Sequence, residues 1–485
     1  MRVNAGNDGR GPGRLAICAD DPSLTPYAGL AIVGELARGT RLVELIDAEL
    51  GASAGAAVKT RRRGVSAGEL VVSLAECQIA GADCFDDIEN VRADPAGAGL
   101  RAVSATPSAP AARQLARRFE PAHIRAIERA QARVAEHVDR RLGRDRGEDV
   151  TFDLDATETA VYGRKKSGAA RSHSGALAYN SYVVTWAQRG RALSSELLGG
   201  NRSRIAASES AAMIARASAL LPTGHGQVTV RGDSGFYSAE LMMGLREQQT
   251  RFSFSAPRTA TMWRALTQIP EDAWAEATRM RGAEVAEIAF TPDGWRHEPL
   301  RLIVRRVSVS AADLRAGHPR ARRRSTIPAD QLQMVLDGTL ASTYAYSFIV
   351  TDIPSDQKIT TEVEHYHRCR AQIEERFKDA KLGQPLRHLP TGDQDANRLW
   401  LTCCLLALNI TALVCDISPA AAASANAPQR TPLRRHAKAL RRILFCVPAR
   451  ITRSARHTIL HLPAGFRDLH AFQVTYTAAC ALGAP

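Results

Sequence analysis

Residues 150–155 read Val-Thr-Phe-Asp-Leu-Asp, an alternation of apolar and polar side chains that is typical of a β-strand. Similar strand patterns follow at 179–187, 192–198, 227–231 and 251–255, and helical patterns at 205–221 and 238–248 separate the last three of them. The acids Asp155 and Asp233 end two of these strand patterns. We therefore expect a mixed α/β sheet that carries acidic residues at its strand ends.

This order of strands and helices is that of an RNase H-like catalytic core, and the flanking sequence divides the chain around it. We predict an all-helical N-terminal domain at 1–147, the two parts of the core at 148–256 and 358–418, a β-rich insertion at 257–357, and a basic C-terminal region at 419–485.

The composition is that of a globular protein with a surplus of positive charge. The 485 residues include 64 Lys and Arg against 50 Asp and Glu, a net charge of +14, and 45% of them are hydrophobic. This surplus favours a polyanionic partner, most often nucleic acid. Nine cations with no acid between them lie near the C-terminus, namely Arg430, Arg434, Arg435, Lys438, Arg441, Arg442, Arg450, Arg453 and Arg456.

Other patterns exclude several classes of protein. The nine cysteines form no CxxC pair, so the sequence predicts neither a zinc site nor a disulfide framework. The N-terminus lacks the apolar core of a signal peptide. The longest apolar run, 399–414, is interrupted by Thr402, Asn409 and Thr411 and is shorter than the roughly 20 residues that a membrane span needs. We interpret the run as a buried helix, and expect no membrane partner and a cytoplasmic location.

Three acids are candidates for catalysis: Asp155, Asp233 and Glu374, the last within a helical pattern over 360–382. Two acids at neighbouring strand ends and a third from a crossing helix form an oxygen-only site, which suits divalent cations such as Mg²⁺. Such a site can hold two ions for an in-line phosphoryl displacement. Taken singly, each acid is better explained as a turn former or a solvated residue. Asp153 remains an alternative to Asp155, because residues two apart on a strand face the same side.

The helix that carries Glu374 has a basic face. His367, Arg370, Glu374, Lys378 and Lys381 follow one another at three- or four-residue spacing, which aligns them on one side. An acid within a basic stripe suits a metal ligand flanked by cations that bind DNA phosphates. The alternative is a surface ladder of ion pairs.

A second candidate DNA contact lies in the N-terminal region. Ser108 followed by Pro110 predicts the start of a helix. On that helix Arg113 and Arg117 lie one turn apart. A solvated charged face explains them most simply, and the functional interpretation is a helix that lies against DNA.

The segments that carry these residues resemble a known family. Residues 152–157, 231–237 and 370–381 are similar to the three acidic blocks of DDE insertion-sequence transposases, most of all the IS thirteen-eighty group. The third block of that superfamily contains Tyr, Arg, Glu and Lys with two, three and six residues between them. Arg370, Glu374 and Lys381 match this signature, and His367 occupies the Tyr position, with Tyr366 one place earlier. The resemblance includes 80–94 and 453–463, so it spans most of the chain.

This resemblance implies a Mg²⁺-dependent DNA transposase of a bacterial insertion sequence that acts at the nucleoid. Asp155, Asp233 and Glu374 would be the catalytic residues and would hold two Mg²⁺ ions, for which Mn²⁺ can substitute. The implied partners are double-stranded DNA, both the terminal inverted repeats and the target, and a second copy of the chain in the DNA complex.

Two alternatives remain, a nuclease of the same fold without strand transfer and a catalytically inactive, transposase-derived DNA-binding regulator. Trp263, Trp274 and Trp295 of the insertion are either core residues or, as in hairpin-forming relatives, residues that stack on a flipped base.

Overall fold

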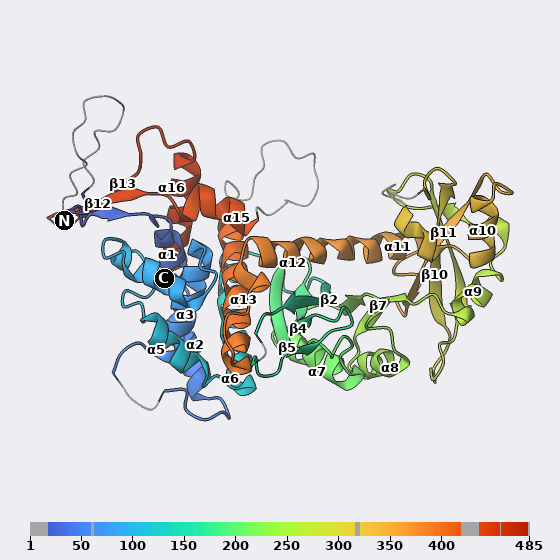
Figure 1. Ribbon diagram of the computed structural model, residues 1–485, viewed down its shortest axis with the longest axis horizontal. Helices are drawn as coiled ribbons and strands as arrows, with labels where there is room; N and C mark the ends of the chain where they lie inside the picture. The colour runs from blue at the N-terminus through green and yellow to red at the C-terminus, as the bar shows by residue number, and fades with distance from the viewer. Residues whose placement is uncertain are drawn as a thin grey trace.

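The computed structural model describes residues 18–59, 63–163, 165–315, 321–418, 436–455 and 457–483. The molecule is elongated, with a helical part at one end, a β-sheet at the centre, and a smaller α/β part at the other end (Figure 1). The helices α11 (Thr360–Arg368) and α12 (Gln372–Leu382) run between the two ends above the sheet. The architecture is therefore mixed α/β.

The central sheet contains the strands that the alternating patterns predict. They are β2 (Val150–Ala160), β3 (Ala170–Arg171), β4 (Leu177–Trp186), β5 (Arg191–Gly199), β6 (Val228–Gly232) and β7 (Arg251–Ala256). The order across the sheet is β5, β4, β2, β6, β7, and β3 also pairs with β4. The strand β2 runs antiparallel to β4 and parallel to β6, and the last residue of β6, Gly232, lies opposite Leu154 in the middle of β2.

Two helices, α7 (Ala207–Ser218) and α8 (Ala239–Glu247), cover one face of this sheet. Their apolar residues form a core with aromatic side chains of the strands, among them Phe152, Phe252 and Phe254, which are fully buried. This packing fixes the strands that carry the candidate acids.

The region predicted as an insertion extends the same sheet. Its elements are α9 (Ala260–Leu266), η3 (Glu271–Ala273), β8 (Ala275–Glu276), β9 (Ala283–Phe290), β10 (Leu300–Ser310), η4 (Ala321–Thr326), α10 (Ala329–Leu336) and β11 (Ser342–Thr351). The antiparallel strands β9, β10 and β11 agree with the predicted β-rich character. Because β11 also pairs with β7, with Thr351 opposite Ser253, the insertion and the core share one continuous sheet.

The N-terminal region is mostly helical, with α1 (Leu30–Gly39), α2 (Leu42–Gly51), α3 (Ala67–Ala80), η1 (Phe85–Asp87), α4 (Ile88–Arg92), η2 (Gly97–Gly99), α5 (Ala109–Ala116) and α6 (Pro121–Arg141). The helical pattern predicted over 30–50 is divided into two helices at Arg41. Its φ of 56° is a left-handed conformation, which interrupts the helix.

The prediction of an all-helical N-terminal domain is not confirmed, because this region also contains a strand. The strand β1 (Leu24–Thr25) pairs with β12 (Ala449–Ser454), which pairs in turn with β13 (His457–His461). These segments come from opposite ends of the described chain and lie side by side in Figure 1.

The C-terminal segments share the hydrophobic core of the N-terminal helices. They include η6 (Pro385–Arg387), α13 (Gln394–Ile417), α15 (Ala437–Leu440), η7 (Arg441–Phe445) and α16 (Leu469–Ala481). The helix α13 packs on α1, α3 and α6, and α16 packs on α1. By length and composition α13 is apolar enough to cross a membrane, but 89% of its most apolar window is buried inside the protein, in agreement with its interpretation as a core helix.

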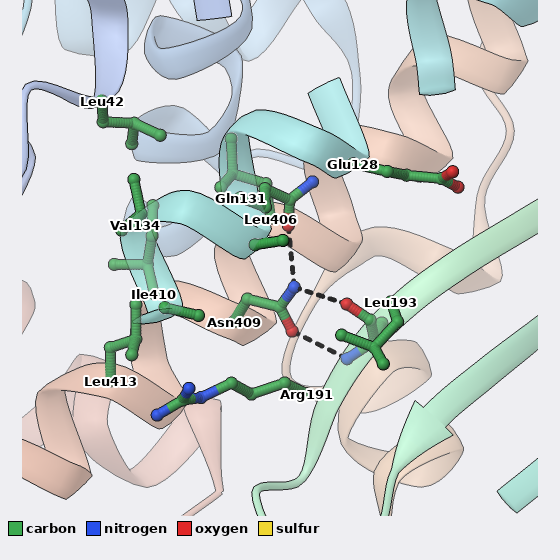
Figure 2. A pocket seen from close by; sticks show the side chains of 13 residues that line it. Leu42, Glu128, Gln131, Val134, Arg191, Leu193, Leu406, Asn409, Ile410 and Leu413 are labelled. Atoms are coloured by element: carbon green, nitrogen blue, oxygen red, sulfur yellow. Dashed lines mark hydrogen bonds between the residues drawn. The ribbon is translucent and has the colours of Figure 1, made fainter. Parts of the chain in front are cut away.

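Asn409 is one of the polar residues in the apolar sequence of α13, and it lines a small pocket beside this helix (Figure 2). The Asn409 amide donates to Gln131 Oε1 of α6 at 2.7 Å and to the Ala192 carbonyl of β5 at 2.9 Å. Its oxygen accepts the Ala192 N–H at 2.9 Å. The pocket has a volume of about 20 Å³, too small for a substrate. Asn409 therefore ties three elements together.

Candidate active site

Two of the three candidate acids, Asp155 and Asp233, come directly after the last residues through which β2 and β6 pair in parallel. In that pairing Asp153 lies opposite Arg231 and Leu154 lies opposite Gly232. The next residues on the two strands are Asp155 and Asp233, so their backbones are adjacent at the same edge. The structure thus brings these two predicted residues to one place.

The Asp155 carboxylate is mostly buried, with 13% of the side chain exposed, and lies 3.5 Å from Nη1 of Arg370. Burial raises the pKa of Asp155 to about 6, and the guanidinium of Arg370 opposes that shift. The negative charges of Asp233 and Glu374 both raise the pKa further. All three candidate acids therefore lie within electrostatic range of one another.

Asp153, the alternative to Asp155, has a different environment. Its two oxygens accept hydrogen bonds from Nε and Nη2 of Arg231 at 2.7 and 2.9 Å, and both side chains are buried. Arg231 also lies over the Tyr366 ring, 4.8 Å from its centroid. Asp153 is thus an ion-pair partner inside the fold. The pattern of the sequence did not identify Arg231, although it precedes Asp233 by two residues on β6.

Asp233 lies in a tight turn after β6. Its Oδ1 accepts the Gly235 N–H at 2.8 Å, and its side chain is partly exposed. The preceding Gly232 is required by a close approach, because a Cβ at that position would lie 2.8 Å from the Phe254 ring. The glycine lets β6 pass this ring and places Asp233 beside Asp155.

Glu374 reaches the site from α12, and the predicted single helix over 360–382 is interrupted just before it. The 3-10 turn η5 (Cys369–Ala371) separates α11 from α12, and Glu374 is exposed in the first turn of α12. The five residues of the predicted basic stripe therefore do not lie on one continuous helix face.

The donor chemistry of the three acids fits divalent ions, because carboxylate oxygens are the ligands that Mg²⁺ prefers and their mutual repulsion would be relieved by a cation. Across the described ranges, no three His, Cys, Asp or Glu side chains are close enough to hold an ion. Asp155 and Asp233 lie together, but Glu374 does not close a three-ligand cluster with them.

Two lysines of the stripe have different surroundings. Lys381 Nζ donates to the Glu158 carbonyl at 2.9 Å, which ties the end of α12 to β2. Lys378 is exposed, and its Nζ is 3.7 Å from Glu375 Oε1. Lys378 is accessible to a phosphate, whereas Lys381 mainly holds the helix on the sheet.

His367 does not face solvent, contrary to the prediction that it contacts DNA. It is buried, and its two ring nitrogens are each 2.9 Å from a hydroxyl, Nδ1 from Ser253 and Nε2 from Ser255. Burial lowers the pKa of His367 to about 3. Both nitrogens already have partners, so we no longer assign a phosphate contact to this residue. Ser253 and Ser255 alternate along β7, and that pattern was the signal for a polar partner facing them.

The two N-terminal arginines differ. Arg113 Nη1 lies 2.8 Å from both carboxylate oxygens of Asp86, so it forms a surface ion pair. Arg117 ends α5 and is exposed. Both arginines are therefore on the surface, where Arg113 is paired with Asp86 and Arg117 is the more exposed of the two.

The basic C-terminal stretch is partly outside the described residues, which omit Arg430, Arg434, Arg435 and Arg456. Arg441 is structural, because it donates to the carbonyls of Ile79 and Gln78 at 2.8 and 3.0 Å. The remaining cations are exposed, namely Lys438, Arg442, Arg450 and Arg453.

The three tryptophans of the insertion are packed. Trp295 is 7% exposed and contacts Phe252 edge to face. Trp263 packs against Phe348, and Trp274 lies under the guanidinium of Arg306, which is 4.2 Å from the ring centroid. Core packing explains all three residues.

Comparison with known proteins gives matches to a family model and to solved structures. A family model described as transposase DDE domain group 1 matches residues 14–318 and 337–481. Among solved structures, a cryo-EM structure of the piggyBac transposase synaptic complex with hairpin DNA is similar at 10% sequence identity and a TM-score of 0.39, over 87% of this chain and 79% of that one. No curated protein matches the chain.

Proposed function

The chain belongs to the transposase DDE domain group 1 family, and from this membership we propose that it is the transposase of an insertion sequence. It would cleave DNA strands at the ends of the element and transfer them into target DNA in a Mg²⁺-dependent reaction. The observation that supports this most directly is the adjacency of Asp155, within β2, and Asp233, which follows the end of the parallel strand β6, with Glu374 in electrostatic range.

The proposed catalytic core is RNase H-like. Its support is the strand order β5, β4, β2, β6, β7, with only the β2, β6 and β7 strands parallel to one another. In such a sheet, carboxylates at the end of the first strand and of a neighbouring parallel strand converge at one edge. The edge that carries Asp155 and Asp233 is therefore the proposed catalytic edge.

Asp155, Asp233 and Glu374 would hold two Mg²⁺ ions. Bound there, the ions would supply charge stabilisation for an in-line phosphoryl displacement. Completing the set requires Glu374 to approach the other two acids, and the η5 turn just before α12 is the place where the backbone can adjust.

Other residues of the chain would position the DNA. Arg370 lies beside Asp155 and, once that carboxylate binds cations, its guanidinium is available to a phosphate oxygen. Lys378 is exposed on α12 and offers a second phosphate contact. Positioning and electrostatic stabilisation are the main requirements of phosphoryl transfer, so no covalent protein intermediate is needed.

The ends of the element would be bound by surfaces at the helical end of the molecule. The hairpin of β12 and β13, which β1 extends to a three-stranded sheet, carries the exposed cations Arg450 and Arg453, which are available to DNA phosphates. Arg117 lies on the same helical part. Two ends must be held together, so a homodimer on DNA is part of the proposal.

Strand cleavage and transfer of a labelled terminal-repeat duplex with Mg²⁺ tests this function. Wild type should give cleaved and joined products, and Asp233→Ala should give none. The matched control is Asp272→Ala, an exposed acid of η3 that should behave as wild type. Equal product from wild type and Asp233→Ala would overturn the catalytic assignment.

The same assay separates the alternatives. Cleavage without joining would indicate a nuclease, and binding without cleavage by any variant would indicate a regulatory protein. The regulatory protein is the alternative that agrees with the absence of a closed three-ligand cluster among the described residues.

A further inference from the structure

The helix that precedes Glu374 is bound to the insertion through a buried carboxylate. Glu364 of α11 is fully buried, and its Oε1 accepts a hydrogen bond from Arg305 Nη1 at 2.6 Å. Arg305 lies on β10 of the insertion. Arg368, one helical turn after Glu364, donates from Nε to the same oxygen at 3.0 Å. Two guanidinium groups therefore hold one carboxylate, and one of the two belongs to the insertion.

Further contacts fix the same end of α11. Arg368 Nη2 donates to the carbonyl of Thr278, in the segment between β8 and β9, at 2.6 Å. Val363 is buried and packs with Ile303 of β10 in a small apolar cluster. His367 is held by two hydroxyl groups of β7. The last turn of α11 is therefore fixed where the insertion strands continue the core sheet.

Beyond the η5 turn, α12 is attached to other parts of the molecule. Lys381 near its end donates to the Glu158 carbonyl of β2 at 2.9 Å, and Asp379 accepts the backbone N–H at the start of α15. Glu374 is six residues after Arg368 and seven before Lys381. Its distance from the acids of the sheet therefore depends on both attachments, the one on α11 and the one at the end of α12.

The ion pair between Glu364 and Arg305 suits a role in geometry. A buried ion pair is weak evidence for stability, because both charges lose their water on folding. A guanidinium and a carboxylate pair within a narrow range of orientations, so the contact fixes how a helix is rotated and where it ends. The end of α11 sets the direction in which the chain enters η5. A displacement of about 1 Å at a catalytic group can cost about a hundredfold in rate, so this direction matters for Glu374.

We propose that Glu364 is a positioning residue for Glu374, and that its contact with Arg305 makes the insertion determine where the third acid lies. The inference rests on the proposed transposase function and deepens it, because it gives the insertion a role in assembling the acidic site. Asp155 and Asp233 lie together on the core sheet, whereas Glu374 does not close a cluster with them among the described residues. The third acid is thus the one whose position needs a separate control.

Two consecutive arginines of β10 offer a matched pair of variants. Arg305 and Arg306 face opposite sides of the sheet, and Arg306 pairs with Glu284 of β9 at 2.7 Å, away from α11. The test compares wild type with Glu364→Gln, Arg305→Met and the control Arg306→Met. In Arg305→Met the carboxylate keeps Arg368 as a counterion, so this variant reports on the contact if Glu364→Gln does not fold.

The first measurement is hydrogen exchange of the backbone amides of residues 369–376 in protein without metal or DNA. These amides should exchange about tenfold faster in Glu364→Gln and Arg305→Met, while the amides of α13 keep the wild-type rate. The second measurement is cleavage of terminal-repeat DNA with Mg²⁺. The rate constant at saturating DNA should fall by about ten- to a hundredfold, and the DNA affinity should be unchanged. Arg306→Met should match wild type in both measurements.

Three results would overturn the proposal. The first is that Glu364→Gln and Arg305→Met match Arg306→Met in both measurements. The second is that exchange rises equally in η5 and in α13, because the ion pair would then stabilise only the fold as a whole. The third is faster exchange with a wild-type cleavage rate, because Glu374 would then not depend on the contact. If wild type does not cleave the DNA, the proposed function fails, and hydrogen exchange, which needs no activity, still decides whether Glu364 positions α12.

Discussion

The guanidinium of Arg231 donates hydrogen bonds to both carboxylate oxygens of Asp153, at 2.7 and 2.9 Å, inside the central sheet. The two side chains are 4% and 3% exposed. Two residues farther along the strand, Asp155 has a looser cationic neighbour in Arg370, at 3.5 Å. Of these two acids of β2, Asp153 therefore stabilises the fold, whereas Asp155 is available for the proposed catalysis.

The first prediction separates these two acids. Asp153→Asn should lower the free energy of unfolding by about 3 to 5 kcal/mol, because it leaves the Arg231 charge buried without a counterion. Asp155→Asn should change the free energy of unfolding by less than about 1 kcal/mol and abolish strand cleavage. Urea unfolding and the cleavage assay measure the two effects. A stable, inactive Asp153→Asn together with an active Asp155→Asn would exchange the roles of the two residues.

The second prediction is a pH dependence caused by His367. Its pKa is lowered from 6.5 to about 3 in the folded protein, first by burial and then by the positive charges of Arg370, Arg231 and Arg305. In the unfolded chain it takes up a proton near pH 6.5, so the unfolded state binds more protons between these two values. The contribution of His367 to the free energy of unfolding is complete above pH 6.5 and falls with decreasing pH, by at most about 1.4 kcal/mol per unit.

Urea unfolding between about pH 7 and about pH 5 measures this slope. Buried carboxyls with raised pKa values, Glu76 and Glu128 among them, contribute to the slope with the opposite sign, so His367→Gln should lower the slope by up to about 1.4 kcal/mol per pH unit, because the amide does not take up a proton in this range. His173→Gln, which replaces an exposed histidine, should leave the slope as in wild type. An unchanged slope in His367→Gln would mean that His367 is accessible to protons in the folded protein.

The local patterns predicted the central strands well. The strands β4, β5, β6 and β7 begin and end close to the expected positions, because alternation within a short stretch records which side chains face the core, whereas β2 begins as expected but continues to Ala160 instead of ending at Asp155. The same alternation predicted correctly that Asp233 follows a strand end, but Asp155 lies in the middle of β2. It could not separate Asp153 from Asp155, because the deciding partner, Arg231, lies on a strand 78 residues away.

Nonlocal contacts account for the other differences. The spacing of His367, Arg370 and Glu374 suits a continuous helix, but the η5 turn lies between them and Ser253 and Ser255 hold the histidine inside. The all-helical N-terminal domain was predicted from segments read in isolation. The pairing of β1 with β12 joins residues more than 400 positions apart, and no local pattern contains that information.

The third prediction concerns the two lysines of α12. Lys381→Ala should weaken DNA binding, because loss of its hydrogen bond to the Glu158 carbonyl loosens the attachment of α12 to β2. Mn²⁺ binding, followed by calorimetry, should fall less than in Glu374→Ala. The matched control Lys378→Ala removes an exposed charge and should lower DNA affinity with a smaller salt dependence and no change in Mn²⁺ binding. Loss of Mn²⁺ binding in Lys381→Ala, with normal binding in Glu374→Ala, would contradict the placement of α12.

The fourth prediction tests the junction around α13. Asn409→Leu should lower the free energy of unfolding by about 3 kcal/mol, because it removes three hydrogen bonds and leaves the backbone groups of Ala192 without those partners. The control is Thr411→Val, which replaces another buried polar residue of the same helix. Its hydroxyl bonds only to the Leu408 carbonyl within α13, so the loss should stay below about 1 kcal/mol. Urea unfolding of both variants measures the difference. Equal effects would show that the polar groups of Asn409 contribute no more than a hydrogen bond within α13. A larger loss for Asn409→Leu would identify this side chain as the link between the helical end and the central sheet.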